Sequence, residues 1–307
     1  MIYTLTVNPS LDYVMTSDCL NIGEVNRSRE DFFIAGGKGI NVSRMLKNLN
    51  IKSVALGFEA GFTGKELISM LQNEGIENDF LSLNNGLTRI NVKIKTNNDT
   101  EFNASGPVIC TDDKRKLFER LNTLYDGDML VIAGNVQKSA GDNFYAEICE
   151  RMGDKNVSVA VDTTGAQLFN TLKHKPFLVK PNNSELEELF GKQNCGMERL
   201  CFFAQKLREK GAKNVLVSLG SGGAFLAAEN GKIYKANAPE ISVKYTVGSG
   251  DCAVAGFIYG YIKSGDCTEA LRLAVACGSA NAASDGFPCK ELVEKLKDKI
   301  IVTEENI

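Results

Sequence analysis

The sequence predicts an α/β protein built on one mostly parallel β-sheet with helices on both faces. Short β-rich runs alternate along the chain with segments of helical periodicity, and this alternation is typical of parallel sheets. Two further stretches interrupt this rhythm, one without a helical pattern and one with polar and apolar residues in alternation, and they indicate a small separate sheet. The chain of 307 residues is long enough to bury one large core. No linker-like or repeated segment indicates a second independent domain.

The expected strands of the main sheet are short and apolar. They lie at residues 2–7, 53–58, 129–133, 157–161, 177–179 and 215–219. Helical periodicity follows most of them, and in residues 39–50 the apolar positions recur on one helical face. Thr63 and Glu66 have the spacing of a capping box, which predicts that a helix opens there and ends near Gly75.

The two stretches that interrupt this alternation predict a lid. Residues 11–34 contain no helical pattern, whereas residues 88–95 alternate cleanly and a turn at 97–99 leads into a return strand at 100–104. The segments 11–34 and 87–105 are expected to form a small antiparallel sheet. Such a sheet covers a site, or pairs with a second copy of the chain through its apolar face. A hairpin without a function is the alternative.

Composition and charge narrow the class of protein. A net charge of −3 argues against broad affinity for nucleic acid or for an anionic membrane surface. No apolar run reaches membrane-spanning length, and the N-terminus has the pattern of a strand rather than of a charged leader. Nine scattered cysteines with the single histidine His174 argue against structural zinc and fit reduced thiols. We therefore expect a cytoplasmic protein whose substrates are small molecules.

A glycine turn that carries a lysine, Gly36-Gly37-Lys38-Gly39, precedes the first expected helix. Glycines let the backbone approach a ligand closely, Lys38 supplies a cation, and Asn41 can hydrogen-bond to sugar hydroxyls. The turn is not a P-loop, because the required earlier glycine and the Ser or Thr after the lysine are missing. A plain connection from strand to helix is the alternative for this turn taken alone.

The run Gly248-Ser249-Gly250-Asp251 opens a helix of small residues. Its N–H groups and the helix dipole suit an anion, and an aspartate there suits a base that takes the proton of a hydroxyl attacking phosphorus. We expect the dipole to keep Asp251 ionised and therefore a weak base. The run also fits a loose dinucleotide-binding pattern. However, it occurs late in the chain, and helix-like segments follow it instead of a strand that ends in an acidic residue.

Two more segments indicate a nucleotide site. Asn182 and Glu185 have the spacing of a helix cap, and the same two side chains can orient water around a Mg²⁺ ion on nucleotide phosphates, Glu185 through water. The turn at residues 218–224 is rich in glycine. At the edge of an α/β sheet it would let ribose or adenine lie against bare backbone, and a simple hairpin turn is the alternative.

Together these residues resemble the ribokinase-type sugar kinases, also called the phosphofructokinase B family, over essentially the whole chain. The two regions typical of that family appear in order, at residues 35–43 and 247–251. The closer resemblance is to its ketose-phosphate kinases, the branch of 1-phosphofructokinase and tagatose-6-phosphate kinase. It is carried by Asn8-Pro-Ser-Leu-Asp12, Glu24-Val-Asn-Arg27 and Thr88-Arg-Ile-Asn-Val-Lys-Ile94. The run at 89–95 is more similar to 1-phosphofructokinase.

The resemblance implies one ribokinase-like domain over residues 1–307, a three-layer α/β/α body with a β-lid over the sugar site. The implied site residues are the base Asp251 with an anion hole at Gly248, Ser249 and Gly250; sugar contacts from Asp12, Gly37 and Asn41; a clamp on the substrate's phosphate from Lys38, Arg89 and Arg27; and nucleotide contacts from Lys180, Asn182, Ser218, Gly220, Gly223 and Asn281. The implied cofactors are ATP and Mg²⁺, with Glu185 near the metal. A homodimer through the lid is the expected assembly.

The expected reaction is ATP-dependent phosphoryl transfer to a ketose phosphate. Fructose 1-phosphate giving fructose 1,6-bisphosphate is the favoured substrate, and tagatose 6-phosphate giving tagatose 1,6-bisphosphate is the alternative. The chain departs from the family pattern at residues 134–137 and at Cys252, a thiol that packs beside the base or makes the enzyme sensitive to alkylation. Asp251 argues against a non-catalytic sugar-phosphate sensor. The missing acidic residue argues against an NAD-linked oxidoreductase.

Overall fold

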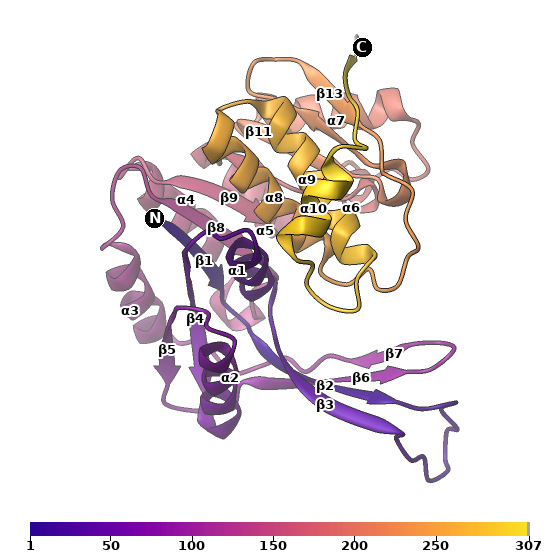
Figure 1. Cartoon of the computed structure of the whole chain (residues 1–307). Helices are drawn as coiled ribbons and strands as arrows, with labels where there is room; N and C mark the ends of the chain where they lie inside the picture. Colours follow the sequence, from indigo (N-terminus) through magenta and orange to yellow (C-terminus); the bar gives the residue numbers. More distant parts are fainter. Residues whose placement is uncertain (306–307) are drawn as a thin grey trace.

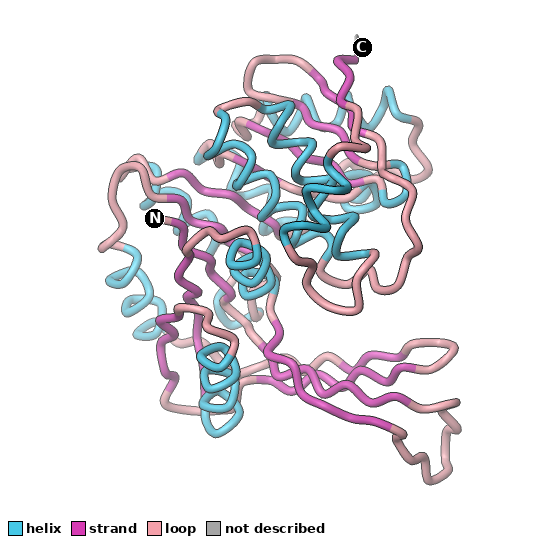
Figure 2. Tube along the Cα trace, viewed as in Figure 1, coloured by secondary structure: helices cyan, strands magenta, loops and turns pink. Residues whose placement is uncertain are grey.

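The structure, a computed structural model, describes residues 1–305 and consists of an α/β body from which a second, smaller sheet projects (Figure 1). The body holds a ten-stranded sheet, and the projecting sheet has four strands. Figure 2 shows helices on both faces of the large sheet and none on the projecting one. The predicted three-layer body with a β-lid is therefore confirmed. No helix within residues 1–305 has the length and apolar character needed to cross a membrane.

Seven neighbouring strands of the large sheet run parallel, and three antiparallel strands complete one edge. In spatial order the strands are β14 (Val302–Glu305), β13 (Ile233–Ala236), β12 (Ala224–Ala227), β11 (Asn214–Ser218), β10 (Leu178–Val179), β9 (Ser158–Asp162), β8 (Met129–Ala133), β1 (Ile2–Thr6), β4 (Ser53–Ala60) and β5 (Asn78–Leu83). All six strands predicted for the sheet are present, with ends that differ by one or two residues. The carboxyl ends of the parallel strands share one edge, which is where ligands bind in open α/β sheets.

The helices form two layers, each with its own apolar core. Their bounds are α1 (Lys38–Asn48), α2 (Gly61–Asn73), α3 (Thr111–Leu121), α4 (Phe144–Gly153), α5 (Gly165–Thr171), α6 (Asn183–Leu189), α7 (Met197–Glu209), α8 (Ser249–Ser264), α9 (Cys267–Ala282) and α10 (Lys290–Lys297), with short 3₁₀ turns η1 (Lys138–Ala140), η2 (Leu172–His174) and η3 (Gly220–Gly222). Side chains of α1, α8, α9 and α10 share one core, and those of α3 to α7 share the other. This arrangement brings α1 and α8 side by side at the ligand edge (Figure 1).

The lid consists of two antiparallel hairpins joined by a parallel pairing. Its strands are β3 (Glu30–Gly36), β2 (Ser10–Thr16), β6 (Arg89–Lys95) and β7 (Thr100–Phe102), in that spatial order. The predicted antiparallel pairing holds within each hairpin, but β2 and β6 run parallel because both leave the body in the same direction. Asp12 and Asn91 lie side by side on a buried polar face, and Tyr13 and Phe33 stack on the opposite face with ring centroids 4.6 Å apart.

One predicted helix start is wrong. Helix α2 begins at Gly61, so Thr63 lies inside its first turn rather than at its cap. The Thr63 hydroxyl is buried and donates to the carbonyl of Thr88 at 2.8 Å, which ties the helix to the start of β6. The predicted end is confirmed, because Gly75 follows the last turn with φ 66°. The capping pattern failed here because a tertiary acceptor, invisible in the sequence, takes the hydroxyl.

Candidate active site

The glycine turn before α8 is held in place by a side chain of α9. Gly248 adopts φ 85°, a left-handed conformation that favours glycine, and α8 begins at the next residue. From α9, Asn281 Nδ2 donates to the carbonyl of Val247 at 3.0 Å and to Ser249 Oγ at 3.1 Å. Asn281 therefore fixes the turn, and its predicted contact with a nucleotide stays a prediction. The first N–H groups of a helix lack acceptors within it, so this turn can hold an anion.

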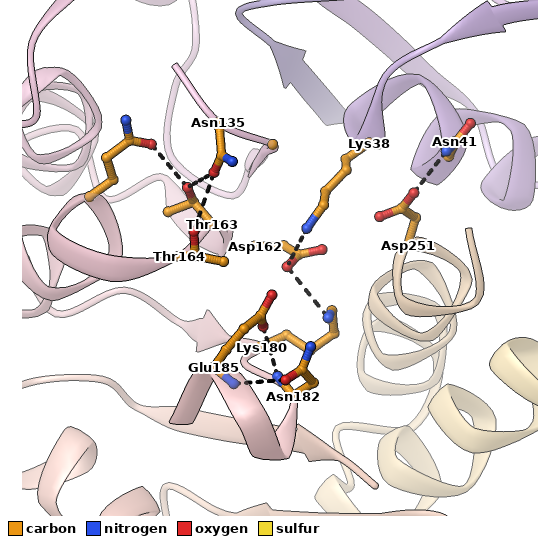
Figure 3. A network of polar contacts seen from close by, with 12 residues as sticks. Lys38, Asn41, Asn135, Asp162, Thr163, Thr164, Lys180, Asn182, Glu185 and Asp251 are labelled. Atoms are coloured by element: carbon orange, nitrogen blue, oxygen red, sulfur yellow. Dashed lines mark hydrogen bonds and ion pairs between the residues drawn. The ribbon is translucent and has the colours of Figure 1, made fainter. Parts of the chain in front are cut away.

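Asp251 lies in the first turn of α8 and is 5% exposed. Asn41 Nδ2 of α1 donates to its Oδ2 at 2.8 Å (Figure 3). Burial is the largest cause that raises the pKa of Asp251, and the nearby Asp162 carboxylate is the second. The pKa is raised to about 7, although Lys38 and Asn41 oppose the shift. The direction of this shift is opposite to the one expected from the helix dipole, and burial is its largest cause. A carboxyl with a pKa near neutrality suits general base catalysis.

A buried carboxylate, Asp162, lies between two lysines at the end of β9. Its Oδ1 is 3.4 Å from Lys38 Nζ and 3.4 Å from Lys180 Nζ (Figure 3). Burial alone would lower the pKa of Lys38, but Asp162 and Asp251 outweigh that effect and raise it, so the lysine is charged. The Lys38 cation thus faces the region between Asp251 and α6. A clamp on the substrate's own phosphate stays a prediction for this residue.

The residues near Asp162 fit a divalent cation. Asp162 Oδ2 is buried and has no hydrogen-bond partner among the described residues. Asn182 and Glu185 form the predicted capping box at the start of α6, each accepting from the other's backbone N–H at 2.8 Å (Figure 3). An unpaired carboxylate oxygen with a second carboxylate close by is the donor set that Mg²⁺ prefers.

A cavity of about 660 Å³, the α8 cavity, lies between the glycine turns and the start of α8. Four residues predicted to contact the nucleotide line it, namely Asn182, Ser218, Gly220 and Gly223, together with Ser249 and Gly250 of the anion hole. Small residues of α8 and α9 and the loop at residues 238–246 form much of its remaining wall. Gly223 has φ 85°, and a side chain there would meet the Ala236 carbonyl at 2.0 Å, so this wall must be bare backbone. Lys180 lies at its edge, against Gly250.

A second cavity of about 590 Å³, the lid cavity, lies where the lid joins the body. It is lined by Asn8, Gly37, Lys38, Arg89, the strap at residues 104–108 and the segment 133–139. Arg89 Nη1 donates to the Ala104 carbonyl at 3.3 Å, but Arg89 Nε is buried without a partner among the described residues. Burial lowers the pKa of Arg89. A half-buried guanidinium with an unused buried donor is a site for an anion.

Asp12, a predicted sugar ligand, lies on the polar face of the lid within a set of donors. Its Oδ1 accepts from Ser10 Oγ at 2.7 Å and from Asn91 Nδ2 at 2.9 Å, and its Oδ2 lies 2.8 Å from Lys93 Nζ. These contacts hold the carboxylate rigidly at the base of the lid. Lys93 was not predicted as a site residue, although its place on the alternating polar face of β6 was the signal that could have found it.

The contacts of Asn41 and the position of Arg27 differ from those expected for their predicted roles. Asn41 uses both ends of its amide within the protein, since Oδ1 accepts from Arg44 Nη1 at 3.1 Å while Nδ2 donates to Asp251. Arg27 is exposed in the loop between β2 and β3, at the outer end of the lid (Figure 1). Direct sugar contact by Asn41 and phosphate contact by Arg27 within one copy therefore stay predictions. Asp162 and Arg44 were missed, because only the folded chain brings them to Asp251.

An α/β body with a polar lid, a glycine turn at the start of α8 and the buried Asp251 in its first turn are features of a carbohydrate kinase of the ribokinase-like fold. The chain belongs to the pfkB family of carbohydrate kinases, whose family model matches residues 7–287.

Relatives cover the chain from end to end. It is 41% identical over 303 residues to 1-phosphofructokinase of Bacillus subtilis, covering 99% of each chain. It is 32% identical over 304 residues to D-tagatose-1-phosphate kinase of Bacillus licheniformis, again covering 99% of each. Its structure is similar to phosphofructokinase-2 from Escherichia coli in complex with fructose-6-phosphate, with a TM-score of 0.91 and 26% identity, covering 97% of this chain and 98% of that one.

Proposed function

We propose that the protein transfers the γ-phosphoryl group of ATP to the C6 hydroxyl of fructose 1-phosphate, giving fructose 1,6-bisphosphate. The observation that carries the proposal is the unpartnered Nε of Arg89 in a cavity that also reaches Lys38, next to Asp251. A kinase for a sugar that already bears a phosphate needs such a cation at one end and a base at the other. The names of both curated relatives given above specify a ketose 1-phosphate.

Asp251 acts as the base in the proposed reaction. Its carboxylate takes the proton of the C6 hydroxyl as O6 forms its bond to the γ-phosphorus, and the bond from that phosphorus to the bridging oxygen breaks to release ADP. The pKa of about 7 leaves Asp251 largely ionised at slightly alkaline pH, where it can accept this proton. The N–H groups of the turn at 248–250 stabilise charge on the group in transit.

The lysines and carboxylates between the cavities would balance the negative charge of the ATP phosphates, the lysines directly and the carboxylates by binding a metal ion. Lys38 and Lys180 lie on either side of Asp162, where the β- and γ-phosphates would pass from the α8 cavity toward Asp251. Asp162 and Glu185 would hold Mg²⁺, Glu185 through water. A Mg²⁺ ion held by these residues would neutralise charge on the phosphate oxygens.

The acceptor's own phosphate would lie at Arg89. A guanidinium pairs with a phosphate through charge-assisted hydrogen bonds, and these are strong in a desolvated cavity. Asp12, positioned by Lys93 and Asn91, would accept from a sugar hydroxyl on the lid side. These roles explain why the polar face of the lid points toward the body and not toward solvent.

The opposite face of the lid supports the proposal of a homodimer. Phe33, Tyr13, Val92 and Phe102 form one row across the four strands. Phe33 is 45% and Phe102 is 62% exposed, an apolar stripe that a second copy would cover. Changing Phe102→Glu should convert a dimer into a monomer in sedimentation velocity, and an unchanged sedimentation coefficient would contradict the proposal. We also propose that the protein is located in the cytoplasm.

An ADP-release assay across four acceptors tests the substrate. Purified protein would receive ATP and Mg²⁺ with fructose 1-phosphate, tagatose 6-phosphate, fructose 6-phosphate or fructose, and Asp251→Asn protein prepared in parallel would control for contaminating kinases. We expect the highest kcat/KM with fructose 1-phosphate. Preference for tagatose 6-phosphate would select the alternative substrate. Preference for unphosphorylated fructose would refute the role given to Arg89.

A further inference from the structure

Arg44 is a buried arginine one helical turn beyond Asn41, on the same side of α1. It is 7% exposed, and its guanidinium makes a two-pronged ion pair with Glu74, with Nε–Oε2 at 2.5 Å and Nη2–Oε1 at 2.8 Å. The ring of Phe287 lies 5.6 Å from it. Arg44 and Glu74 line a separate cavity of about 420 Å³ and line neither the α8 cavity nor the lid cavity.

The remaining guanidinium nitrogen of Arg44, Nη1, is linked to the catalytic site through Asn41. Arg44 Nη1 donates to Asn41 Oδ1 at 3.1 Å, and Asn41 Nδ2 donates to Asp251 Oδ2 at 2.8 Å. An arginine carries donors only, whereas an asparagine amide has a donor end and an acceptor end. The guanidinium therefore permits only one orientation of the amide, the one that directs its NH₂ group to the base.

The opposite orientation would harm the base. It would place Asn41 Oδ1 against a carboxylate oxygen of Asp251 and the NH₂ group against the guanidinium, so that two acceptors and two donors would face each other. The carboxyl would then have to be protonated to donate to the amide, and a protonated Asp251 cannot accept the substrate's proton. With the orientation fixed, Oδ2 is occupied and Oδ1 is left for the substrate hydroxyl.

We propose that Arg44 is a positioning residue for the catalytic base, acting through the amide of Asn41, with Glu74 at the end of α2 holding the guanidinium in place. The inference rests on the proposed role of Asp251 and gives Asn41 a task other than sugar binding. Glu74 is the C-terminal cap residue of α2, so the chain of contacts joins the end of α2, through the first two turns of α1, to the start of α8.

The test removes the ion pair as a unit. Changing Arg44→Met alone would leave the half-buried Glu74 carboxylate without its partner, whereas Arg44→Met with Glu74→Leu replaces the pair by apolar groups and keeps the net charge. In this paired variant we expect kcat to fall about 10- to 100-fold with both KM values within about threefold of wild type, as is usual for a misplaced catalytic group. The melting temperature, measured in parallel, shows that the variant is folded.

Two further measurements separate positioning from a merely structural role. Adding Asn41→Leu to the paired variant should cost nothing beyond Asn41→Leu alone, because both changes break the same chain of contacts. Asp251 should also titrate at higher pH in the paired variant, read from its ¹³C-carboxyl NMR signal. The charged groups that face Asp251 besides this chain, Lys38, Asp162 and Lys180, are unchanged.

The outcomes are distinct. A kcat within twofold of wild type, full additivity with Asn41→Leu, or an unmoved Asp251 titration would each overturn the proposal. The NMR titration needs no substrate, so it decides the positioning role even if the wild-type protein phosphorylates none of the ketose phosphates. That last result would count against the proposed function and not against the chain from Glu74 to Asp251.

Discussion

The α8 cavity and the lid cavity differ in what lines them. The α8 cavity is lined by glycine turns, by small residues of α8 and α9 and by the loop at residues 238–246, and at Gly223 its wall is bare backbone. The lid cavity has several polar side chains in its wall, including Arg89, whose Nε is buried without a partner among the described residues. Substitutions at the glycine turns of the first cavity should therefore act by steric strain, and substitutions at the polar residues of the second by loss of charge or hydrogen bonds. Asp251, the proposed base, lines neither cavity, and its loss should be the most severe.

Asp251→Asn should lower kcat by about three orders of magnitude or more, because the amide cannot accept a proton. Nucleotide affinity, measured by calorimetry, should stay within about threefold, since the α8 cavity keeps its walls. Near-normal turnover would remove Asp251 from its role.

The same variant should be more stable than wild type at alkaline pH. The native pKa of about 7 lies above the ordinary value of an aspartate, so between these values the folded protein binds more protons than the unfolded chain and stability falls as pH rises. Thermal melts at pH 5 and pH 8 should therefore show a larger gain of the variant at the higher pH.

Arg89→Met should raise the KM for the sugar phosphate about 100-fold and leave the KM for ATP within about threefold. The effect should vanish with an unphosphorylated sugar, because only the phosphate uses the guanidinium. A parallel rise in the KM for ATP would show that the two cavities do not bind their ligands independently, contrary to what their different lining residues indicate.

Activity should fall below neutral pH. Since Asp251 must be ionised, kcat/KM should decline about tenfold per pH unit below a midpoint near 7. A pH–rate profile with fructose 1-phosphate measures the midpoint. A midpoint near 4, the ordinary range of aspartate, would mean that burial does not govern this carboxyl in solution.

Gly223→Ala should weaken ATP binding about tenfold and lower the melting temperature, because the new Cβ would meet the Ala236 carbonyl at 2.0 Å. Gly220→Ala is the matched control from the same turn. It also has positive φ, at 59°, but no atom lies within 4 Å of an added Cβ. If both substitutions weaken ATP binding equally, the positive φ alone causes the loss, and the close approach of the Ala236 carbonyl does not.

Sequence reasoning succeeded where the chemistry is contiguous in the chain. The turn at 248–251 and the cap formed by Asn182 with Glu185 are local patterns, and the structure contains both. The tasks of Asp162, Lys93 and Arg44 depend on contacts with Lys38, Asp12 and Glu74, each at least 30 positions away, and no local pattern encodes these. The pKa of Asp251 was misjudged for the same reason, since its burial is a tertiary property.

The smallest expected effect concerns Gln137, where the chain departs from the family pattern. Gln137 Nε2 donates to the Pro107 carbonyl of the strap at 3.3 Å, and Oε1 is buried in the wall of the lid cavity without a donor among the described residues. An unused acceptor in this wall favours a substrate hydroxyl near the phosphate. Fructofuranose 1-phosphate has one there, on C2, whereas a ketofuranose 6-phosphate has only the ring oxygen beside its phosphate-bearing carbon.

Gln137→Leu should therefore lower kcat/KM for fructose 1-phosphate about 10-fold, the effect of one hydrogen bond to a neutral group. The matched ligand is 2,5-anhydromannitol 1-phosphate, which has hydrogen in place of the C2 hydroxyl. Wild type should have a lower kcat/KM for this ligand than for fructose 1-phosphate. The variant should have nearly equal kcat/KM values for both ligands, because it lacks the acceptor that the C2 hydroxyl would contact. If the discrimination survives the substitution, another residue reads that hydroxyl, and the lid cavity selects its ligand by the phosphate alone.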